Sequence, residues 1–184
     1  MDRMYAQFAT DAACELLAID SPTGFTAAAA NWVEQAFTAL GFPCVRTTKG
    51  GVLVDLGGTD AEDGLFLEAH VGTLGAMVSE IKGNGRLKVT NLGGMRAENS
   101  EAENIRVHTR DGRIIEGTLQ LCNASVHVNM SYGDTKRTWG TMEVVLDEDV
   151  NSAADTRALG IEVGDIVAFD PRTVVTKTGY IKSR

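Results

Sequence analysis

Apolar residues recur at helical spacing in the first part of the chain. Met4, Phe8, Ala12 and Leu16 lie four residues apart, so they share one face of a helix. The segment after them contains Pro22 and interrupts this pattern, because proline removes a backbone donor and restricts its neighbour. We therefore predict an amphipathic helix followed by a loop over residues 21–25.

A second apolar stripe follows this loop. Its members, which alternate with polar residues at helical spacing, are Trp32, Val33, Ala36, Phe37 and Leu40. Thr26 precedes the stripe, and we expect its hydroxyl to accept a hydrogen bond from an unpaired backbone N–H at the start of the helix. Gly41 suits the left-handed residue that ends a helix.

Short strands are predicted next. Residues 44–47 and 52–56 flank Lys49, Gly50 and Gly51, a sequence typical of a hairpin turn. Residues 65–70 form an apolar run that ends in a histidine, and such runs belong to strands buried on both faces of a covered sheet. Residues 1–72 are thus predicted to form the first part of an α/β layered domain.

The pattern changes near residue 73. Glycine turns, including Asn84-Gly85 and Asp111-Gly112, separate short segments that alternate apolar and polar residues. Ser152 and Gly160 bound one short predicted helix. The predicted strands are residues 76–81, 87–90, 104–109, 113–121, 142–146 and 166–169. Their regular spacing predicts a small barrel or sandwich.

The predicted organisation is an α/β fold interrupted by a β-rich insertion. Residues 1–72 form its first part, residues 73–168 form the insertion, and residues 169–184 begin the return to the α/β domain. The α/β domain is predicted to be incomplete, because a covered sheet needs helices on both faces and only two helices precede the insertion.

Composition and charge exclude some functions. The formal net charge of −8 disfavours binding to nucleic acid, because an acidic surface repels phosphate. No apolar run approaches the roughly 20 residues of a membrane helix, and residues 1–6 lack the pattern of a signal peptide. The three cysteines are widely spaced and odd in number, which favours free thiols. We expect a cytoplasmic protein that contacts neither membrane nor nucleic acid.

Several motifs occur in an order that resembles one family. They are residues 21–24 (SPTG), 68–78 (EAHVGTLGAMV), 92–94 (LGG), 125–129 (SVHVN), 142–148 (MEVVLDE), 159–165 (LGIEVGD) and 169–172 (FDPR). Each motif alone is weak, but their order and spacing resemble the glutamyl aminopeptidase and tetrahedral aminopeptidase family over nearly the whole chain.

The resemblance implies both a fold and an activity. It implies an α/β/α catalytic domain interrupted by a small β-barrel-like dimerisation domain, of which this chain is the N-terminal portion. It also implies a cytoplasmic metalloaminopeptidase that uses two divalent ions, zinc or cobalt, to remove N-terminal residues from short peptides. A homo-oligomer assembled through the β-rich insertion is implied as well.

His70 is the residue that the resemblance assigns to a metal ion. A neutral imidazole at a strand end is a favoured zinc ligand, although a histidine in an apolar run can also be buried and satisfied by the backbone. The family pattern is His-x-Asp, whereas Gly72 replaces the aspartate here and offers no oxygen. Either water or another carboxylate replaces it, or the site is impaired, or the change has no functional meaning.

The resemblance places the remaining metal ligands and the general base beyond the residues of this chain. We therefore assign no catalytic residue and expect the 184 residues to be inactive alone, with at most partial metal binding. His108 is predicted to be a solvated strand residue, and His127 to be structural or to face substrate. Residues 147–149 form an acidic cluster that is predicted to be a solvated turn.

Two other functions remain open. The chain could be a non-catalytic β-rich module that self-associates. It could also be a carbohydrate-active enzyme, which would need two carboxylates about 5–9.5 Å apart, a separation that a sequence does not reveal.

Overall fold

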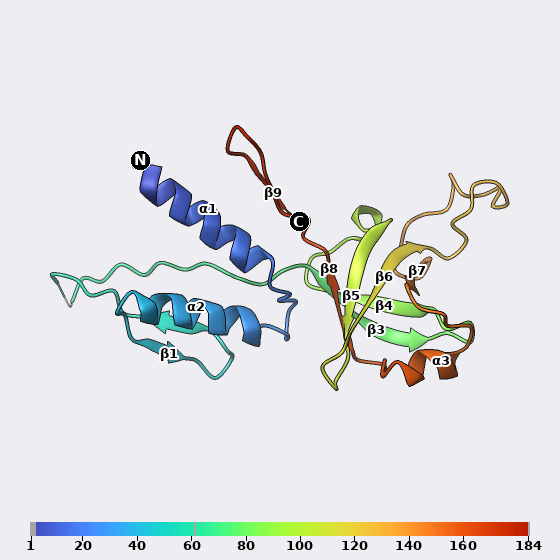
Figure 1. Cartoon of the computed structure of the whole chain (residues 1–184), viewed down its shortest axis with the longest axis horizontal. Coiled ribbons are helices and arrows are strands. Elements are labelled where there is room, and N and C mark those ends of the chain that lie inside the picture. Colours follow the sequence, from blue (N-terminus) through green and yellow to red (C-terminus); the bar gives the residue numbers. More distant parts are fainter. Residues whose placement is uncertain (1–2, 61, 184) are drawn as a thin grey trace.

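The computed structural model describes residues 3–60 and 62–183. Residues 1 and 2 belong to the segment 1–6 that lacks a signal-peptide pattern, and they lie outside the described residues. Arg184 lies outside them as well. Figure 1 shows helices α1 and α2 with a small hairpin on one side, and a group of longer strands on the other. We call α1, α2, β1 and β2 the α/β part, and strands β3 to β8 the barrel.

The two predicted helices are present. Helix α1 spans Arg3–Leu17 and helix α2 spans Ala27–Ala39. Thr26 occupies the N-cap position of α2, but its side chain makes no capping hydrogen bond, so that prediction is wrong. The reason is its backbone, whose ψ of 1° departs from the extended conformation that directs an N-cap hydroxyl toward the first turn.

The predicted hairpin follows α2. Strands β1 (Cys44–Arg46) and β2 (Val52–Val54) pair antiparallel, and α2 contacts both of them. This small unit buries little: among the apolar residues described in the α/β part, Ala29 and Ala30 are the buried ones. The α/β part therefore has no large apolar core of its own.

The barrel confirms the predicted β-rich fold. Six antiparallel strands close in the order β3-β4-β7-β6-β5-β8. Their bounds are β3 Gly75–Ile81, β4 Leu87–Leu92, β5 Glu103–His108, β6 Ile114–Leu121, β7 Met142–Leu146 and β8 Ile166–Phe169. A single 3-10 turn, η1, spans Ala97–Asn99 between β4 and β5.

Alternation along the strands builds the core of the barrel. On β6, Ile115, Leu119 and Leu121 are buried, and the residues on the opposite face of the strand are exposed or partly exposed. Gly117 continues this inward series without a side chain. A Cβ atom there would lie 2.5 Å from the carbonyl oxygen of Val145, so glycine is what allows β6 and β7 to approach.

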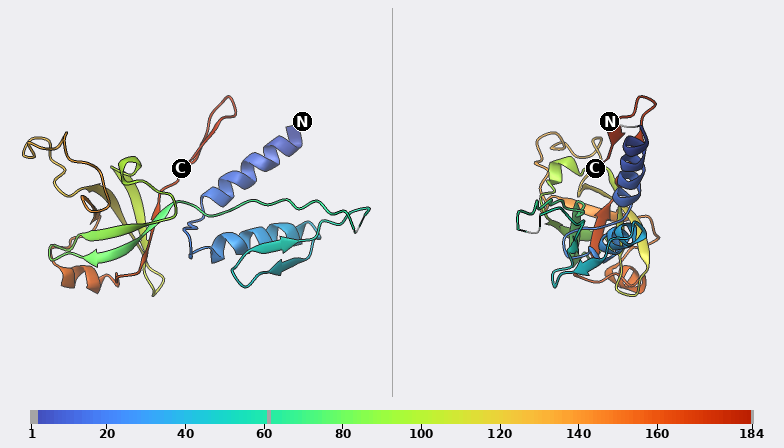
Figure 2. Two further views of the ribbon diagram at one scale, coloured as in Figure 1. Left: turned by 180° about the vertical axis from the view of Figure 1, so that it is seen from behind. Right: turned by 90° about the vertical axis from the view of Figure 1, so that its left-hand side faces the viewer.

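The remaining elements are short. Helix α3 spans Ala153–Ala158, and the Ser152 hydroxyl accepts a hydrogen bond from the Asp155 N–H at 3.2 Å, as predicted. Strands β9 (Val174–Val175) and β10 (Ile181–Lys182) pair as a hairpin that projects away from the barrel (Figure 2). None of the described helices is long and apolar enough to cross a membrane.

Among residues 3–60 and 62–183, Glu143 on β7 is the one glutamate whose side chain is almost wholly buried. Its side chain is 1% exposed and accepts hydrogen bonds from Lys82 and Arg86, which lie on either side of the β3–β4 turn. Burial raises the pKa of Glu143, but the two cationic donors outweigh burial and hold this pKa below its usual range. The ion pairs therefore tie β7 to the β3–β4 turn.

Replacing Glu143 by glutamine is expected to lower the free energy of unfolding by about 2–4 kcal/mol at pH 7, because two cations lose their shared carboxylate. A carboxyl with a depressed pKa stabilises the fold above its unfolded pKa, and this contribution is lost as pH falls through the lower, folded pKa. The difference between the wild type and the variant should therefore shrink below about pH 4. Urea denaturation at pH 7 and pH 3 measures both effects.

Glu116→Gln is the matched control, because Glu116 is exposed on the neighbouring strand β6. We expect it to change the free energy of unfolding by less than about 0.5 kcal/mol. Equal losses in the two variants would show that the enclosed ion pairs add nothing to stability.

Candidate functional site

The segment that carries His70 contains no strand. From residue 64 to residue 74 the backbone has no regular structure, and Figure 1 shows it as a plain trace between β2 and β3. Leu65, Phe66 and Leu67 are 86%, 74% and 75% exposed. The predicted buried strand over residues 65–70 is therefore wrong for this chain.

Missing neighbours explain the unpaired segment. A strand that is apolar on both faces gains stability only when strands flank it and helices cover both faces. Helix α1 buries none of its residues, and its Met4, Tyr5 and Phe8 side chains are exposed to solvent. The described residues thus provide neither the flanking strands nor the cover, although the local sequence is suited to a strand.

His70 lies within this segment and is exposed. The alternative of a buried histidine satisfied by the backbone is therefore wrong. Across residues 3–60 and 62–183, no group of three or more histidine, cysteine, aspartate or glutamate side chains is placed to hold a metal ion. The role of His70 as a ligand stays a prediction.

Gly72 is exposed and stands in open surroundings. A Cβ atom there would meet one atom within 4 Å, the carbonyl oxygen of Ser21 at 3.7 Å, which is an ordinary contact. Gly72 is not among the glycines with positive φ, so its backbone does not require glycine. An aspartate would therefore fit at this position.

The residues around His70 can be compared with the ligands that a two-ion centre needs. Two ions about 3.5–4 Å apart need a bridging carboxylate and several further ligands. The described chain offers one exposed imidazole at this place, and Gly72 adds no oxygen atom. The residues present do not fit a two-ion centre by themselves.

The other predicted positions lie away from this segment. His127 is exposed in the long loop after β6, and residues 147–149 are exposed after β7, as expected for a solvated turn. The three cysteines are free thiols. None of these residues approaches His70 closely enough to join it in a metal-binding group within the described chain.

His108 is the histidine that sequence reasoning misjudged. It was predicted to be solvated, but its side chain is 15% exposed and its Nε2 atom lies 2.7 Å from an Asp20 carboxylate oxygen. Arg106 also binds Asp20, with Nε to Oδ2 at 2.8 Å and Nη2 to Oδ1 at 2.6 Å. No local pattern could reveal this, because Asp20 lies in the loop between α1 and α2, far from β5 in the sequence.

The surroundings of Asp20 change its acidity. Burial raises the pKa of Asp20, but hydrogen bonds from Arg106 and His108 outweigh burial and lower it from 3.8 to about 2. The folded pKa lies below the unfolded one, so this interaction stabilises the fold at pH values above about 4 and is lost as pH falls through about 2. The shift corresponds to about 2 kcal/mol.

Replacing Arg106 by glutamine is expected to raise the pKa of Asp20 from about 2 toward 3.8, because the bidentate cation is removed. Carbon-13 NMR of the Asp20 carboxyl through an acid titration measures this shift. Arg110→Gln is the control, since Arg110 contacts Asp165 and Val163 instead. A midpoint for Asp20 that stays the same in both variants would contradict the assignment of Arg106 as the cause.

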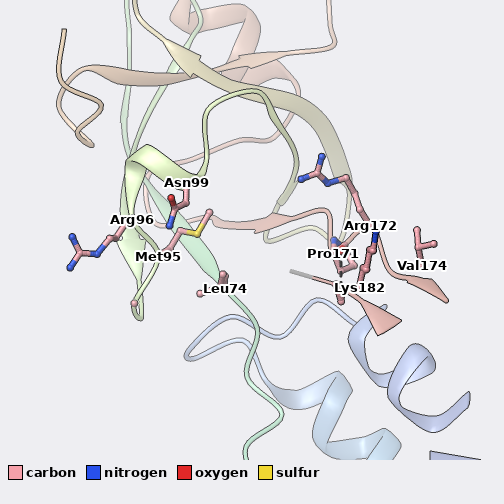
Figure 3. Close-up of a pocket in the computed structure, with 10 residues that line it drawn as sticks. Leu74, Met95, Arg96, Asn99, Pro171, Arg172, Val174 and Lys182 are labelled. Carbon is pink, nitrogen blue, oxygen red and sulfur yellow. Dashed lines mark hydrogen bonds between the residues drawn. The ribbon is translucent and has the colours of Figure 1, made fainter. Parts of the chain in front are cut away.

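An open cavity of about 670 Å³ lies between the barrel and the β9–β10 hairpin. Its lining includes Arg96, Arg172 and Lys182, but these cations do not converge, because the Arg96 side chain points away from the other two (Figure 3). Arg172 donates to Glu103 at 2.6 Å. The cavity therefore lacks the convergent polar groups of a formed binding site.

Comparison with known proteins finds relatives that are described as aminopeptidases. Residues 50–184 match the profile of a family described as M42 glutamyl aminopeptidase. A protein of Bacillus subtilis (strain 168), whose name describes it as an aminopeptidase, YhfE, is 44% identical over 170 residues, which cover 92% of this chain and 49% of that protein. The glutamyl aminopeptidase of Lactococcus lactis subsp. cremoris (strain MG1363) is 23% identical over 168 residues, covering 89% of this chain and 46% of the relative.

Solved structures share the fold. An aminopeptidase, APDkam598, from the archaeon Desulfurococcus kamchatkensis has a TM-score of 0.80 at 21% identity, covering 94% of this chain and 46% of that one. The TET1 peptidase of Pyrococcus horikoshii, which can assemble into a tetrahedron or a large octahedral shell, has a TM-score of 0.68 at 16% identity, covering 93% and 49%. This chain thus spans about half the length of the proteins it matches.

Proposed function

The chain belongs to the M42 glutamyl aminopeptidase family, and from this membership we propose that it is the N-terminal portion of a two-metal aminopeptidase acting on short peptides. The parent activity is the metal-dependent hydrolysis of an N-terminal peptide bond, with zinc or cobalt as the ions. His70 is proposed as the first ligand, because the sequence around it resembles the family's His-x-Asp segment and lies within the matched residues 50–184.

The observation that carries this proposal is the joint match of sequence and fold. The matched residues 50–184 include both the His70 segment and the whole barrel. The structural likeness extends over nearly the full chain, including the helices before the matched region. These supports concern the family and the fold, and peptide hydrolysis by the whole protein follows from them as a proposal.

We further propose that a polypeptide of these 184 residues is inactive alone. Hydrolysis by a two-ion centre needs both ions held in place, and it needs a base that accepts a proton from the attacking water. Beside His70, the described residues supply no further cluster of ligands. What this chain contributes is one imidazole and the scaffold that carries it.

An assay of the chain with glutamyl-, aspartyl- and leucyl-p-nitroanilide is expected to show no turnover above a blank that contains Co²⁺ or Zn²⁺ alone. The glutamyl aminopeptidase of L. lactis, assayed in parallel, is the positive control. Metal-dependent turnover by the chain, abolished in the His70→Ala variant, would contradict the proposal that its centre is incomplete.

The open space at Gly72 gives a second test. The family pattern His-x-Asp has an aspartate two residues after the histidine, so Gly72→Asp would restore a carboxylate near the imidazole of His70. Because a partner of this kind typically changes metal affinity by about 10–100-fold, we expect the variant to bind Zn²⁺ at least about 10-fold more tightly. Titration calorimetry, with NMR of the His70 ring, measures this gain.

Gly64→Asp is the matched control, since Gly64 lies in the same exposed segment and a Cβ there meets nothing within 4 Å. We expect it to leave Zn²⁺ affinity unchanged, and we expect His70→Ala to cancel the gain in the Gly72→Asp background. If both aspartates increased affinity equally, the effect would come from added charge and His70 would have no part in it.

A non-catalytic, self-associating module remains the alternative function. It is favoured by exposed apolar residues on the loop after β6, where Val126, Val128 and Met130 are 57%, 73% and 94% exposed. The TET1 peptidase, which shares this fold, can assemble into a tetrahedron or a large octahedral shell, and this also favours self-association. Metal-independent self-association of the chain in sedimentation velocity, together with no turnover, would favour this alternative.

A further inference from the structure

We propose that the Asp20 carboxylate is a clamp that sets the orientation of the α/β part on the barrel. The α/β part and the barrel are joined covalently by one segment, which runs from β2 to β3 and ends with residues 71–74. One such connection alone permits rotation of one part against the other. The loop between α1 and α2 adds a non-covalent attachment, and Asp20 is its centre.

The geometry at Asp20 is that of a strong, directional ion pair. Both carboxylate oxygens are used, since Arg106 donates to each of them and His108 contacts Oδ2 as well. The side chains of Asp20, His108 and Arg106 are 12%, 15% and 24% exposed. Because the pair is bidentate and mostly shielded, it fixes an angle as well as a distance.

Arg106 also reaches the chain that leaves the barrel after β8. Its Nη1 atom lies 3.8 Å from an oxygen of Asp170, which follows β8 directly. The Asp170 N–H donates to the carbonyl oxygen of Asn104 on β5, at 3.0 Å. One guanidinium on β5 therefore holds a carboxylate from the helical loop and lies near one from the chain that leaves the barrel.

The rest of the loop packs around this contact. The Phe25 ring lies 4.8 Å from the His108 ring, centroid to centroid. A Cβ atom at Gly75 would lie 2.5 Å from the Cβ of Pro22, so the loop packs tightly on the start of β3. Gly24, at φ 84°, permits the turn closed by the Phe25 N–H and the Pro22 carbonyl oxygen.

Ser21 ties the same loop to the covalent connection that precedes β3. Its N–H donates to the Thr73 hydroxyl at 3.0 Å, and its carbonyl oxygen accepts from the Thr73 N–H at 2.8 Å. These bonds stay within the loop and its neighbouring connection, so they do not reach β5. The link from the loop to β5 therefore depends on Asp20 and on the contact between Phe25 and His108.

Distances between spin labels on the two parts test the clamp. Labels are placed at Gln35→Cys on α2 and Glu80→Cys on β3, both exposed positions, after the three native cysteines are replaced by serine. With Asp20 intact we expect a narrow distance distribution. In Asp20→Asn, which keeps the shape and removes the charge, we expect a distribution at least about two-fold wider.

Asp111→Asn is the matched control. Asp111 accepts from Arg113 through both Nε and Nη2, so it also forms an aspartate–arginine pair, but one confined to the β5–β6 turn. Its removal is expected to leave the distribution unchanged. Arg106→Gln should widen the distribution as Asp20→Asn does, and the double variant should widen it no further, because both changes break one interaction.

Asp20→Asn and Arg106→Gln each test by themselves whether the ion pair fixes the orientation of the two parts. Circular dichroism and the melting curve establish that the barrel is folded, and its core lies away from Asp20. A narrow, unshifted distribution in folded Asp20→Asn or in folded Arg106→Gln would overturn the proposal. Equal widening in Asp111→Asn would overturn it as well, because the effect would then follow any lost surface pair.

Discussion

The closure of the barrel by β8 is the interaction on which the described structure depends. β8 pairs with β3 on one side and with β5 on the other, so the barrel has no free edge. Closure also surrounds a core in which Leu87, Ile105, Leu119, Met142 and Val167 are almost wholly buried. Every other described element attaches to this closed unit or extends from it.

Sequence patterns predict this barrel well, because each strand pairs with strands that lie within the same hundred residues of the chain. Alternation of apolar and polar residues predicted β3 to β7, and the Asn84-Gly85 and Asp111-Gly112 turns predicted two hairpins. Where the sequence left a barrel or a sandwich open, the closed pairing of β8 decides for the barrel. Local pattern and tertiary structure agree here, as expected for a unit that buries its own core.

The same patterns fail where a residue's partner is missing or remote in sequence. Residues 65–70 have the composition of a central strand, but pairing requires neighbours that the described chain does not contain, so Leu65 and Phe66 are exposed. His108 was misjudged for a different reason: its partner Asp20 is 88 residues away, and a charged contact of that kind leaves no periodic signal. Thr26 shows a third limit, since its identity suits an N-cap but its backbone dihedral angles do not.

These failures bear directly on the proposed metal site. A ligand is held in a productive orientation only when its supporting backbone is itself held by packing and hydrogen bonds. His70 lies in an unpaired segment, and Gly72 provides no carboxylate to orient the imidazole. Strands paired on both sides of residues 65–70 would bury the apolar run and at the same time fix the direction of His70. In the proposed enzyme, completion of the sheet and formation of the metal centre would therefore be one structural requirement, and the proposed clamp at Asp20 would set how that centre faces the barrel.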